Sequence, residues 1–402
     1  MKPPHHIRLL AILGALQALG PFAIDMYLPG FKSIAADFQT EVREVGYSLT
    51  SYFAGICLGQ VFCGPIIDRF GRRLPMMIGL IIFATASIGC AVAPSLGWLV
   101  FMRLLLALGA CFGMVASRAI VRDVYQPDDI ARIFSTLMLI MGAAPIIAPF
   151  MGSFFIEHLS WRAVFIFLGS FTAVLLAAVY FFLPESRQPD PGISLAPAVV
   201  VQDYRIVLRH PDFLAYCVAG GLGMASMFAY ISGAPHLFMN ILALDEATFA
   251  WMFAINAIGF IACAQLNRVF LNHFTSQTII RTCSMMALVV ASVFIAVSLA
   301  QVHSVLVYSA LIFLYMSCLG PMVPNATALA LRPFSRFAGS ASALLGSMQM
   351  LFAAVASGLV SKLESTTAVP MATVMALCML SLLLVVRQRA RVKLMPTVHA
   401  SL

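Results

Sequence analysis

Long apolar segments separated by short polar ones constrain the fold of this 402-residue chain more than any other feature. About 20 apolar residues suffice for an α-helix to cross the hydrocarbon core of a bilayer. Only 10% of the residues are charged, whereas soluble domains carry about 25%. The pattern therefore predicts an all-α membrane protein and excludes an ordinary soluble enzyme. We predict twelve spans, at residues 9–29, 46–67, 75–93, 98–118, 132–156, 162–183, 213–234, 247–267, 279–300, 304–326, 338–360 and 369–386.

The longest polar stretch lies between the sixth and seventh predicted spans, from Pro184 to Pro211. It predicts an N-terminal six-helix bundle at residues 1–183, a cytoplasmic linker at 184–211 and a C-terminal six-helix bundle with a short tail at 212–402. A weak repeat supports this division, because Asp68-Arg69 after the second span matches Asn267-Arg268 after the eighth. Two parallel repeats favour a transporter with its substrate site between them, near the middle of the bilayer.

The basic residues predict the orientation. If the N-terminus is cytoplasmic, 19 of the 24 Lys and Arg residues lie on the cytoplasmic side, four lie outside, and Arg103 alone lies within a span. Such an excess predicts that both termini are cytoplasmic. The net charge of +8 then reflects cytoplasmic loops, so we expect the lipid bilayer and not nucleic acid as the surrounding partner.

Several patterns of chemistry are missing from the sequence. The nine cysteines form no C-x-x-C pair, the eight histidines form no H-E-x-x-H pattern, and no G-x-x-x-x-G-K-[ST] loop occurs. We therefore expect no metal site, no cofactor and no ATP-driven transport, and we expect a protein that is not an enzyme. A channel or sensor remains an alternative class at this point.

The sharpest local motif follows the second span and reads Gly64-Pro65-Ile66-Ile67-Asp68-Arg69-Phe70-Gly71-Arg72-Arg73. Gly64 and Gly71 are expected to permit a tight turn, and the segment also fits a generic cytoplasmic loop rich in positive charge. The pattern G-x-x-x-D-R-x-G-R-R in this place resembles the signature of the major facilitator superfamily. The resemblance implies a gating loop that latches the two halves in the outward-facing form and that argues against a channel. The implied gating residues are Gly64, Asp68, Arg69, Gly71 and Arg72, with Asp123 after the fourth span as the partner of Arg72.

Further segments are similar to the bicyclomycin-resistance branch of the drug:proton antiporters in this superfamily. They are Ile24 to Pro29, Arg122-Asp123, Ala144 to Gly152, Trp161-Arg162 and Pro324-Asn325. The resemblance implies a monomer in the bacterial inner membrane that exports small amphipathic drugs in exchange for protons. An exporter of a metabolite or amino acid on the same fold is the alternative, because such motifs indicate the transport mechanism more than the identity of the transported molecule. In the fourth span the sequence departs from the family, since Leu106 stands where a Gln often follows the Arg.

Gly142, Pro145, Pro149 and Gly152 recur on one face of the fifth predicted span. Small side chains and missing backbone donors on one face predict a bendable, closely packed helix. The family's antiporter motif usually has an adjacent Gly-Pro followed by Gly-Gly, which this chain lacks. The face by itself therefore does not identify antiport.

Asp25 is the one acidic residue well inside a predicted span, and Arg103 is the one basic residue there. Ionisable groups at such depth are costly and usually mark a proton or substrate path. At about 1.5 Å per residue, both lie roughly 6 to 8 Å below the outer boundary. The two opposite charges are expected to interact across a central cavity. Alternatives are that Asp25 caps a helix end at the interface, or that the two form a static ion pair.

We predict that protons and drug compete for Asp25. Burial favours its neutral form, whereas Arg103 or a cationic drug favours its ionised form. Protonation from outside would accompany drug release, and proton loss to the cytoplasm would accompany drug loading. Polar positions predicted to reach the substrate cavity are Gln17, Tyr52, Tyr230, Asn256 and Tyr315, although Tyr and Asn also join helices to one another.

Overall fold

A computed structural model describes residues 3–125, 127–190, 192, 197–334, 338–363 and 366–394. This part of the chain is helical and contains no β-strand. Its twelve long helices have 19 to 32 residues each. They are α1 (Pro3–Asp25), α3 (Val42–Phe70), α4 (Arg73–Ala91), α5 (Leu96–Val124), α6 (Pro127–His158), α7 (Trp161–Phe182), α9 (Pro211–Pro235), α10 (Glu246–Phe270), α11 (Ser276–Leu299), α12 (Val305–Leu331), α13 (Ala338–Leu363) and α14 (Val369–Leu394).

The long helices have the length and composition of membrane spans. Within the described residues, eleven segments are long and apolar enough to cross a bilayer, and α6 is a further helix of 32 residues. Even the 19 residues of α4 extend about 28 Å, close to the roughly 30 Å thickness of a hydrocarbon core. The chain is therefore a multi-pass membrane protein, as its apolar pattern predicts.

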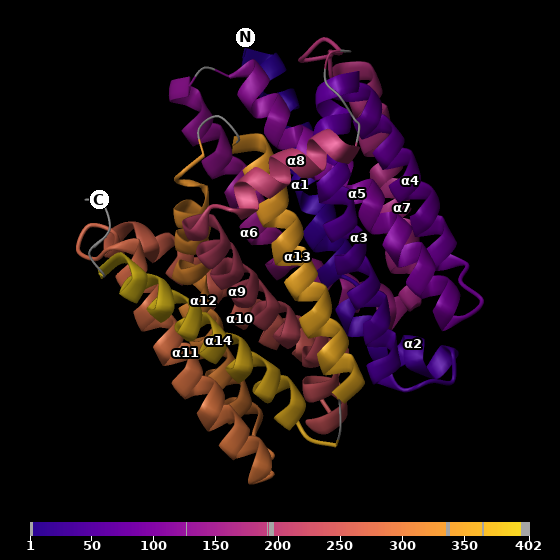
Figure 1. Ribbon diagram of the computed structural model, residues 1–402. Helices are drawn as coiled ribbons and strands as arrows, with labels where there is room; N and C mark the ends of the chain where they lie inside the picture. Colours follow the sequence, from indigo (N-terminus) through magenta and orange to yellow (C-terminus); the bar gives the residue numbers. More distant parts are fainter. Residues whose placement is uncertain are drawn as a thin grey trace.

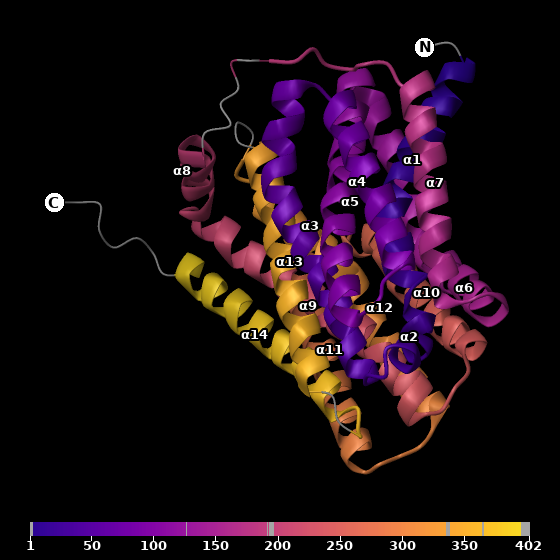
Figure 2. The same cartoon turned by 90° about the vertical axis from the view of Figure 1, so that its right-hand side faces the viewer.

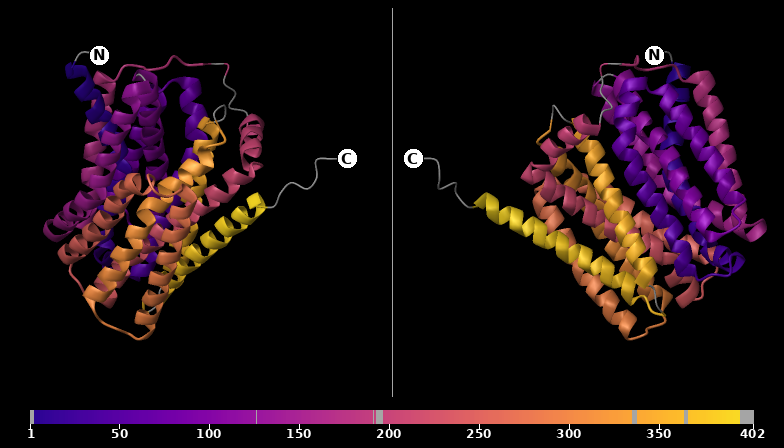
Figure 3. Two further views of the ribbon diagram at one scale, coloured as in Figure 1. Left: turned by 90° about the vertical axis from the view of Figure 1, so that its left-hand side faces the viewer. Right: turned by 45° about the vertical axis from the view of Figure 1, so that its right-hand side comes forward.

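The helices gather into two groups, which we call the N-terminal half (α1 to α7) and the C-terminal half (α9 to α14). In the first, α5 packs against α3 and α4, and α4 packs against α7; in the second, α12 packs against α10 and α11, and α14 packs against α9 and α11. Figure 1 and the right-hand view of Figure 3 show the indigo-to-magenta helices mostly on one side and the orange and yellow ones on the other, with α13 lying beside α3. The halves meet where α13 lies along α3 and where α10 lies along α6 (Figure 2).

Uncharged contacts join α3 to the C-terminal half. The Thr50 and Ser357 hydroxyl oxygens lie 2.9 Å apart, and the Ser347 hydroxyl donates to the Cys57 carbonyl at 3.1 Å. Nearby, the rings of Phe53 on α3 and Phe228 on α9 have centroids 4.2 Å apart. These contacts between the halves involve hydroxyl, carbonyl and ring groups and no charged side chain.

Two short helices lie outside the predicted spans: α2 (Phe31–Asp37), and α8 (Pro197–Leu208) within the predicted linker. A π-helical segment, η2 (His236–Ile241), extends α9. A third short helix, η1 (Leu28–Gly30), overlaps the end of the predicted first span, because α1 ends at Asp25 and not near residue 29. Pro29 accounts for this end, since the ring of a proline clashes with the carbonyl four residues before it.

The predicted turn at Gly64 is wrong. Gly64 lies within α3, which continues to Phe70, and a Cβ atom added there would have no neighbour within 4 Å. The chain turns only at Gly71, whose φ of 84° is one that residues with side chains rarely adopt. The ten-residue motif is therefore mostly the last two turns of α3, with a short connection to α4.

Gly152, the last residue of the predicted small-residue face of α6, lies against the break in α1. At Gly152, an added Cβ atom would lie 2.0 Å from the Met26 carbonyl oxygen, so only glycine permits this approach of two backbones. Pro149 is buried on the same helix and Pro145 is half-buried. Gly142 belongs to α6, but its surroundings lie outside the part that the structure describes.

Replacing Gly152 with Ala should therefore destabilise the protein, whereas Gly64→Ala should not. The clash at Gly152 is with backbone, so α6 must move away from the break at a cost of about 1 to 3 kcal/mol. The same substitution at Gly64 adds a methyl group in open space inside a helix and should gain about 0.5 to 1 kcal/mol. Thermal unfolding of both purified variants measures the difference, and equal unfolding midpoints would contradict the close approach.

Candidate functional site

The break at the end of α1 exposes helix carbonyl groups inside the protein. Asp25, the last residue of α1, is only 4% exposed, and its carboxylate makes no hydrogen bond or ion pair with any described residue. The Ala23 carbonyl of the same turn accepts a hydrogen bond from Nη1 of Arg103 at 2.6 Å. A cation at this place is favourable because the C-terminal end of a helix carries partial negative charge.

Arg103, on α5, is completely buried in an aromatic cage. Its guanidinium carbon lies 4.7 Å from the ring centroid of Tyr27 and 4.6 Å from that of Tyr52. The ring of Phe165 on α7 is the third wall, at 6.0 Å. Such cation–π contacts are worth about 2 kcal/mol when desolvated. Nε and Nη2 have no hydrogen-bond partner, so two buried donors of Arg103 are unused.

The cage is held in place by hydrogen bonds from α3. The Ser48 hydroxyl donates to the Val45 carbonyl at 2.6 Å and lies 2.5 Å from the Tyr27 hydroxyl. Because the single proton of Ser48 is already used, the Tyr27 hydroxyl must donate to Ser48. The Tyr27 ring also packs edge-on against Phe31 of α2. The turn that follows the break is thus fixed to both neighbouring helices.

Two polar residues of the C-terminal half lie on helices next to this region. Asn256 on α10 donates from Nδ2 to the Tyr230 hydroxyl of α9 at 3.0 Å, and the carbonyl oxygen of its side chain has no partner. Helix α10 also contacts η1, the segment that follows Asp25. No ion pair joins Asp25 to Arg103 within the described residues.

The other two predicted cavity residues join helices to one another. Gln17 donates to the Ser117 hydroxyl at 2.7 Å and to the Met114 carbonyl at 3.3 Å, which ties α1 to α5. Tyr315 on α12 contacts the Ser226 hydroxyl and donates to the Met375 carbonyl of α14 at 3.1 Å. Among the described residues, the hydrogen bonds of both side chains stay within one half of the protein.

A second polar cluster lies at the Gly71 turn. Nε of Arg72 donates to Oδ2 of Asp123 at 2.8 Å, which is the predicted pairing, and Nη1 donates to Asp68. Burial disfavours the charged guanidinium, but hydrogen bonds and charge from these two carboxylates outweigh it and raise the pKa of Arg72. The backbone carbonyl of Arg69 accepts from the Asp190 amide of the linker at 3.0 Å.

Sequence reasoning missed Glu185, which holds this turn from the linker side. Its carboxylate accepts hydrogen bonds from the backbone amides of Arg72 at 2.7 Å and Arg73 at 3.0 Å. These amides are at the N-terminus of α4, where a negative charge is favourable. In the sequence, the one hint of this role is the position of an acidic residue directly after Pro184, at the end of a span. At Gly71, an added Cβ atom would lie 2.8 Å from the Glu185 carboxylate.

Membrane-length helices in two groups, with buried charged and polar groups at their junction, define the class of multi-pass membrane transporters. The chain belongs to the Major Facilitator Superfamily, whose family model matches residues 13–357. The solved structures that it resembles share its fold. One is a D-xylose–proton symporter, at a TM-score of 0.74 and 16% identity, covering 94% of this chain and 96% of that one. Another is a bacterial homolog of the lysosomal transporter Spinster, at 0.72 and 14%, covering 97% and 96%.

Sequence relatives confirm the branch that the motifs indicate. The chain is 33% identical to an uncharacterized MFS-type transporter of Bacillus subtilis, YdgK, over 92% of each chain. It is 27% identical to a bicyclomycin resistance protein homolog of Haemophilus influenzae, over 91% of this chain and 92% of the relative. It is 28% identical to a chloramphenicol resistance protein of Pseudomonas aeruginosa, over 89% and 85%.

Replacing Glu185 with Gln should loosen the turn before α4. An amide keeps the size of the side chain but loses the charge that strengthens two backbone hydrogen bonds, at a cost of about 1 to 2 kcal/mol. Thermal unfolding measures the loss. Glu157→Gln is the matched control, because Glu157 is exposed at the end of α6 and has no partner among the described residues. Equal midpoints for the two variants would rule out the capping role of Glu185.

Replacing Arg103 with Lys should destabilise the protein although the charge is kept. The planar guanidinium fills the slot between the Tyr27 and Tyr52 rings, and an ammonium group loses most of this stacking, worth about 2 kcal/mol. Arg162→Lys is the control, since Arg162 stacks on Trp161 at 4.3 Å but is 36% exposed and should lose less than about 1 kcal/mol. Unfolding midpoints that fall equally would contradict a structural role of the cage.

Proposed function

We propose that this transporter exports small amphipathic drugs in exchange for protons and that Asp25 is the proton-binding residue. One observation carries the proposal: a buried carboxyl group without a partner among the described residues lies at a helix break, where the Ala23 carbonyl binds an arginine with two unused donors. An ionised carboxylate without partners is costly inside a membrane. In this conformation Asp25 therefore holds a proton.

The exchange follows from competition at this group. When Asp25 loses its proton to the cytoplasm, its negative charge is stabilised by Arg103 or by a cationic drug that enters the site. When a proton arrives from outside, the attraction to the drug is lost and the drug is released. One charge crossing 100 mV is worth about 2.3 kcal/mol and one pH unit about 1.4 kcal/mol. For an uncharged drug, a single proton thus supports a gradient of a few hundredfold, whereas one-for-one exchange with a cationic drug moves no net charge and leaves only the pH term.

Tyr52, Tyr230 and Asn256 are proposed to form the wall of the drug site. They come from both halves, and the two tyrosine rings offer stacking surfaces with a polar end. Stacking on rings tolerates many shapes, which suits relatives whose names include bicyclomycin, chloramphenicol and multidrug resistance. Drug specificity in this proposal depends on the rings more than on individual hydrogen bonds.

Gating is proposed to use the Gly71 turn and α6. Asp68, Arg69, Arg72 and Asp123 would latch the halves in the outward-facing form, with Glu185 holding the turn. The helix that carries Gly142, Pro145, Pro149 and Gly152 would bend as the halves rock. We propose the orientation with both termini cytoplasmic, in the inner membrane of a bacterium, and a monomer as the working unit.

Asp25→Asn should abolish drug-driven proton movement in inverted membrane vesicles that carry a pH gradient. Addition of chloramphenicol or a lipophilic cation such as ethidium should collapse the gradient in vesicles with the unmodified protein. The asparagine variant cannot take up a proton, so its gradient should persist. Drug-for-drug counterflow of chloramphenicol, which carries no charge, should remain, because the amide keeps the site folded and an uncharged drug does not need the carboxylate.

Glu157→Gln serves as the control and should dissipate the gradient like the unmodified protein. Undiminished dissipation by Asp25→Asn would remove Asp25 from the scheme. If drugs leave the gradient intact but an amino acid or other metabolite collapses it, the transporter is an antiporter of cellular metabolites on the same fold.

A further inference from the structure

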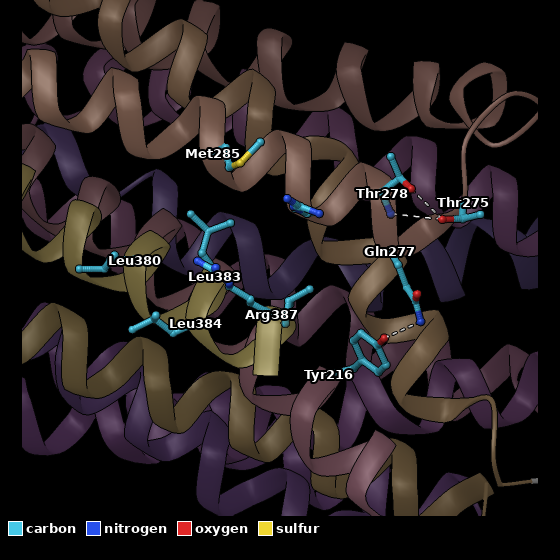
Figure 4. A pocket seen from close by; sticks show the side chains of 11 residues that line it. Tyr216, Thr275, Gln277, Thr278, Met285, Leu380, Leu383, Leu384 and Arg387 are labelled. Atoms are coloured by element: carbon cyan, nitrogen blue, oxygen red, sulfur yellow. Dashed lines mark hydrogen bonds between the residues drawn. The ribbon is translucent and has the colours of Figure 1, made fainter. Parts of the chain in front are cut away.

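A cavity of about 640 Å³ lies far along the C-terminal half from Asp25, where α9 and α11 begin and α14 ends (Figure 4). It belongs to neither polar cluster described above. In the predicted topology it opens at the cytoplasmic boundary of the bilayer. Its lining combines polar and basic residues with an apolar wall: Tyr216, Thr275, Gln277, Thr278, Arg281, Met285, Leu380, Leu383, Leu384, Val386 and Arg387.

Two arginines supply unpaired positive charge to this cavity. Arg281 on α11 and Arg387 on α14 are both exposed, and neither forms a hydrogen bond or ion pair through its side chain with a described residue. Asp212, in the first turn of α9, is paired with Arg389 at 2.7 Å. Gln277 donates to the Tyr216 hydroxyl at 2.8 Å (Figure 4) and not to either arginine. The polar end of the cavity is thus complementary to an anion.

The apolar wall follows the polar end in the direction of the bilayer core. Met285 lies one turn after Arg281 on α11, and Leu380 and Leu384 lie one or two turns before Arg387 on α14. Because α11 and α14 run in opposite directions, both apolar sets extend to the same side of the arginines. These three side chains are 44 to 52% exposed, and a bilayer would cover them.

We propose that this cavity binds an anionic phospholipid, with its phosphate at Arg281 and Arg387 and its acyl chains along Met285, Leu380 and Leu384. A phospholipid has an anionic headgroup followed by apolar chains. The cavity offers arginines at its rim and apolar side chains further in, so the two match along their length. Basic pockets between helices on the cytoplasmic side of a membrane attract such headgroups. The bound lipid would hold α11 and α14 together at the end of the C-terminal half.

Native mass spectrometry of the full chain in detergent, titrated with phosphatidylglycerol, tests the assignment. Each arginine near an anionic headgroup contributes about fivefold in affinity, so Arg281→Gln with Arg387→Gln should weaken binding about thirtyfold. The double lysine variant keeps both charges and should stay within a few-fold of the unmodified protein. Arg332→Gln is the control, because Arg332 is exposed at the end of α12 and does not line the cavity.

Three results would overturn the proposal. The double glutamine variant would bind phosphatidylglycerol as tightly as the Arg332 control, or the unmodified protein would bind phosphatidylcholine as tightly as phosphatidylglycerol. In the third, inorganic phosphate in tenfold excess would displace the lipid, which would identify a site for a free anion. None of these readouts depends on transport, so the result is independent of the role proposed for Asp25.

Discussion

The hydrogen bond from Arg103 to the Ala23 carbonyl is the contact on which the centre of the structure depends. A helix that ends inside a membrane leaves carbonyl groups that no water can reach, and each costs several kcal/mol when unsatisfied. Arg103 satisfies one of them and places its charge at the negative end of α1. The break at Asp25 is stable because a cation from α5 lies there, and the cation is tolerated because the break lies there.

This reciprocity explains why the small-residue face of α6 is needed. An unbroken helix would present side chains to α6, whereas the break presents the backbone of Met26, which Gly152 admits. The same α6 lies along α10 of the C-terminal half. The break and the C-terminal half are therefore both packed against α6. In the proposed exchange, this packing connects protonation of Asp25 to the rocking of the halves.

Much of the fold could be predicted, because every spanning helix must be long enough to cross the bilayer. That length is visible in the sequence as a run of apolar residues. The early end of α1 could have been predicted from Pro29. The ring of a proline clashes with the carbonyl group four residues before it, which here belongs to Asp25. The turn assigned to Gly64 failed because α3 continues past its glycine and proline to Phe70. The role of Glu185 was not predicted, because its hydrogen bonds join segments that are far apart in the sequence. Such contacts produce no recognisable sequence pattern.

In the candidate site, the charged residues could be predicted from the sequence, but their contacts could not. Asp25 and Arg103 stand out in a sequence because ionisable residues in spans are rare, but the expected pairing between them is absent from this structure. Aromatic rings take its place: Tyr27 and Tyr52 stabilise the guanidinium without neutralising it. A cation so held keeps its full charge and two free donors. In the proposed exchange, these free donors would let Arg103 stabilise an ionised Asp25.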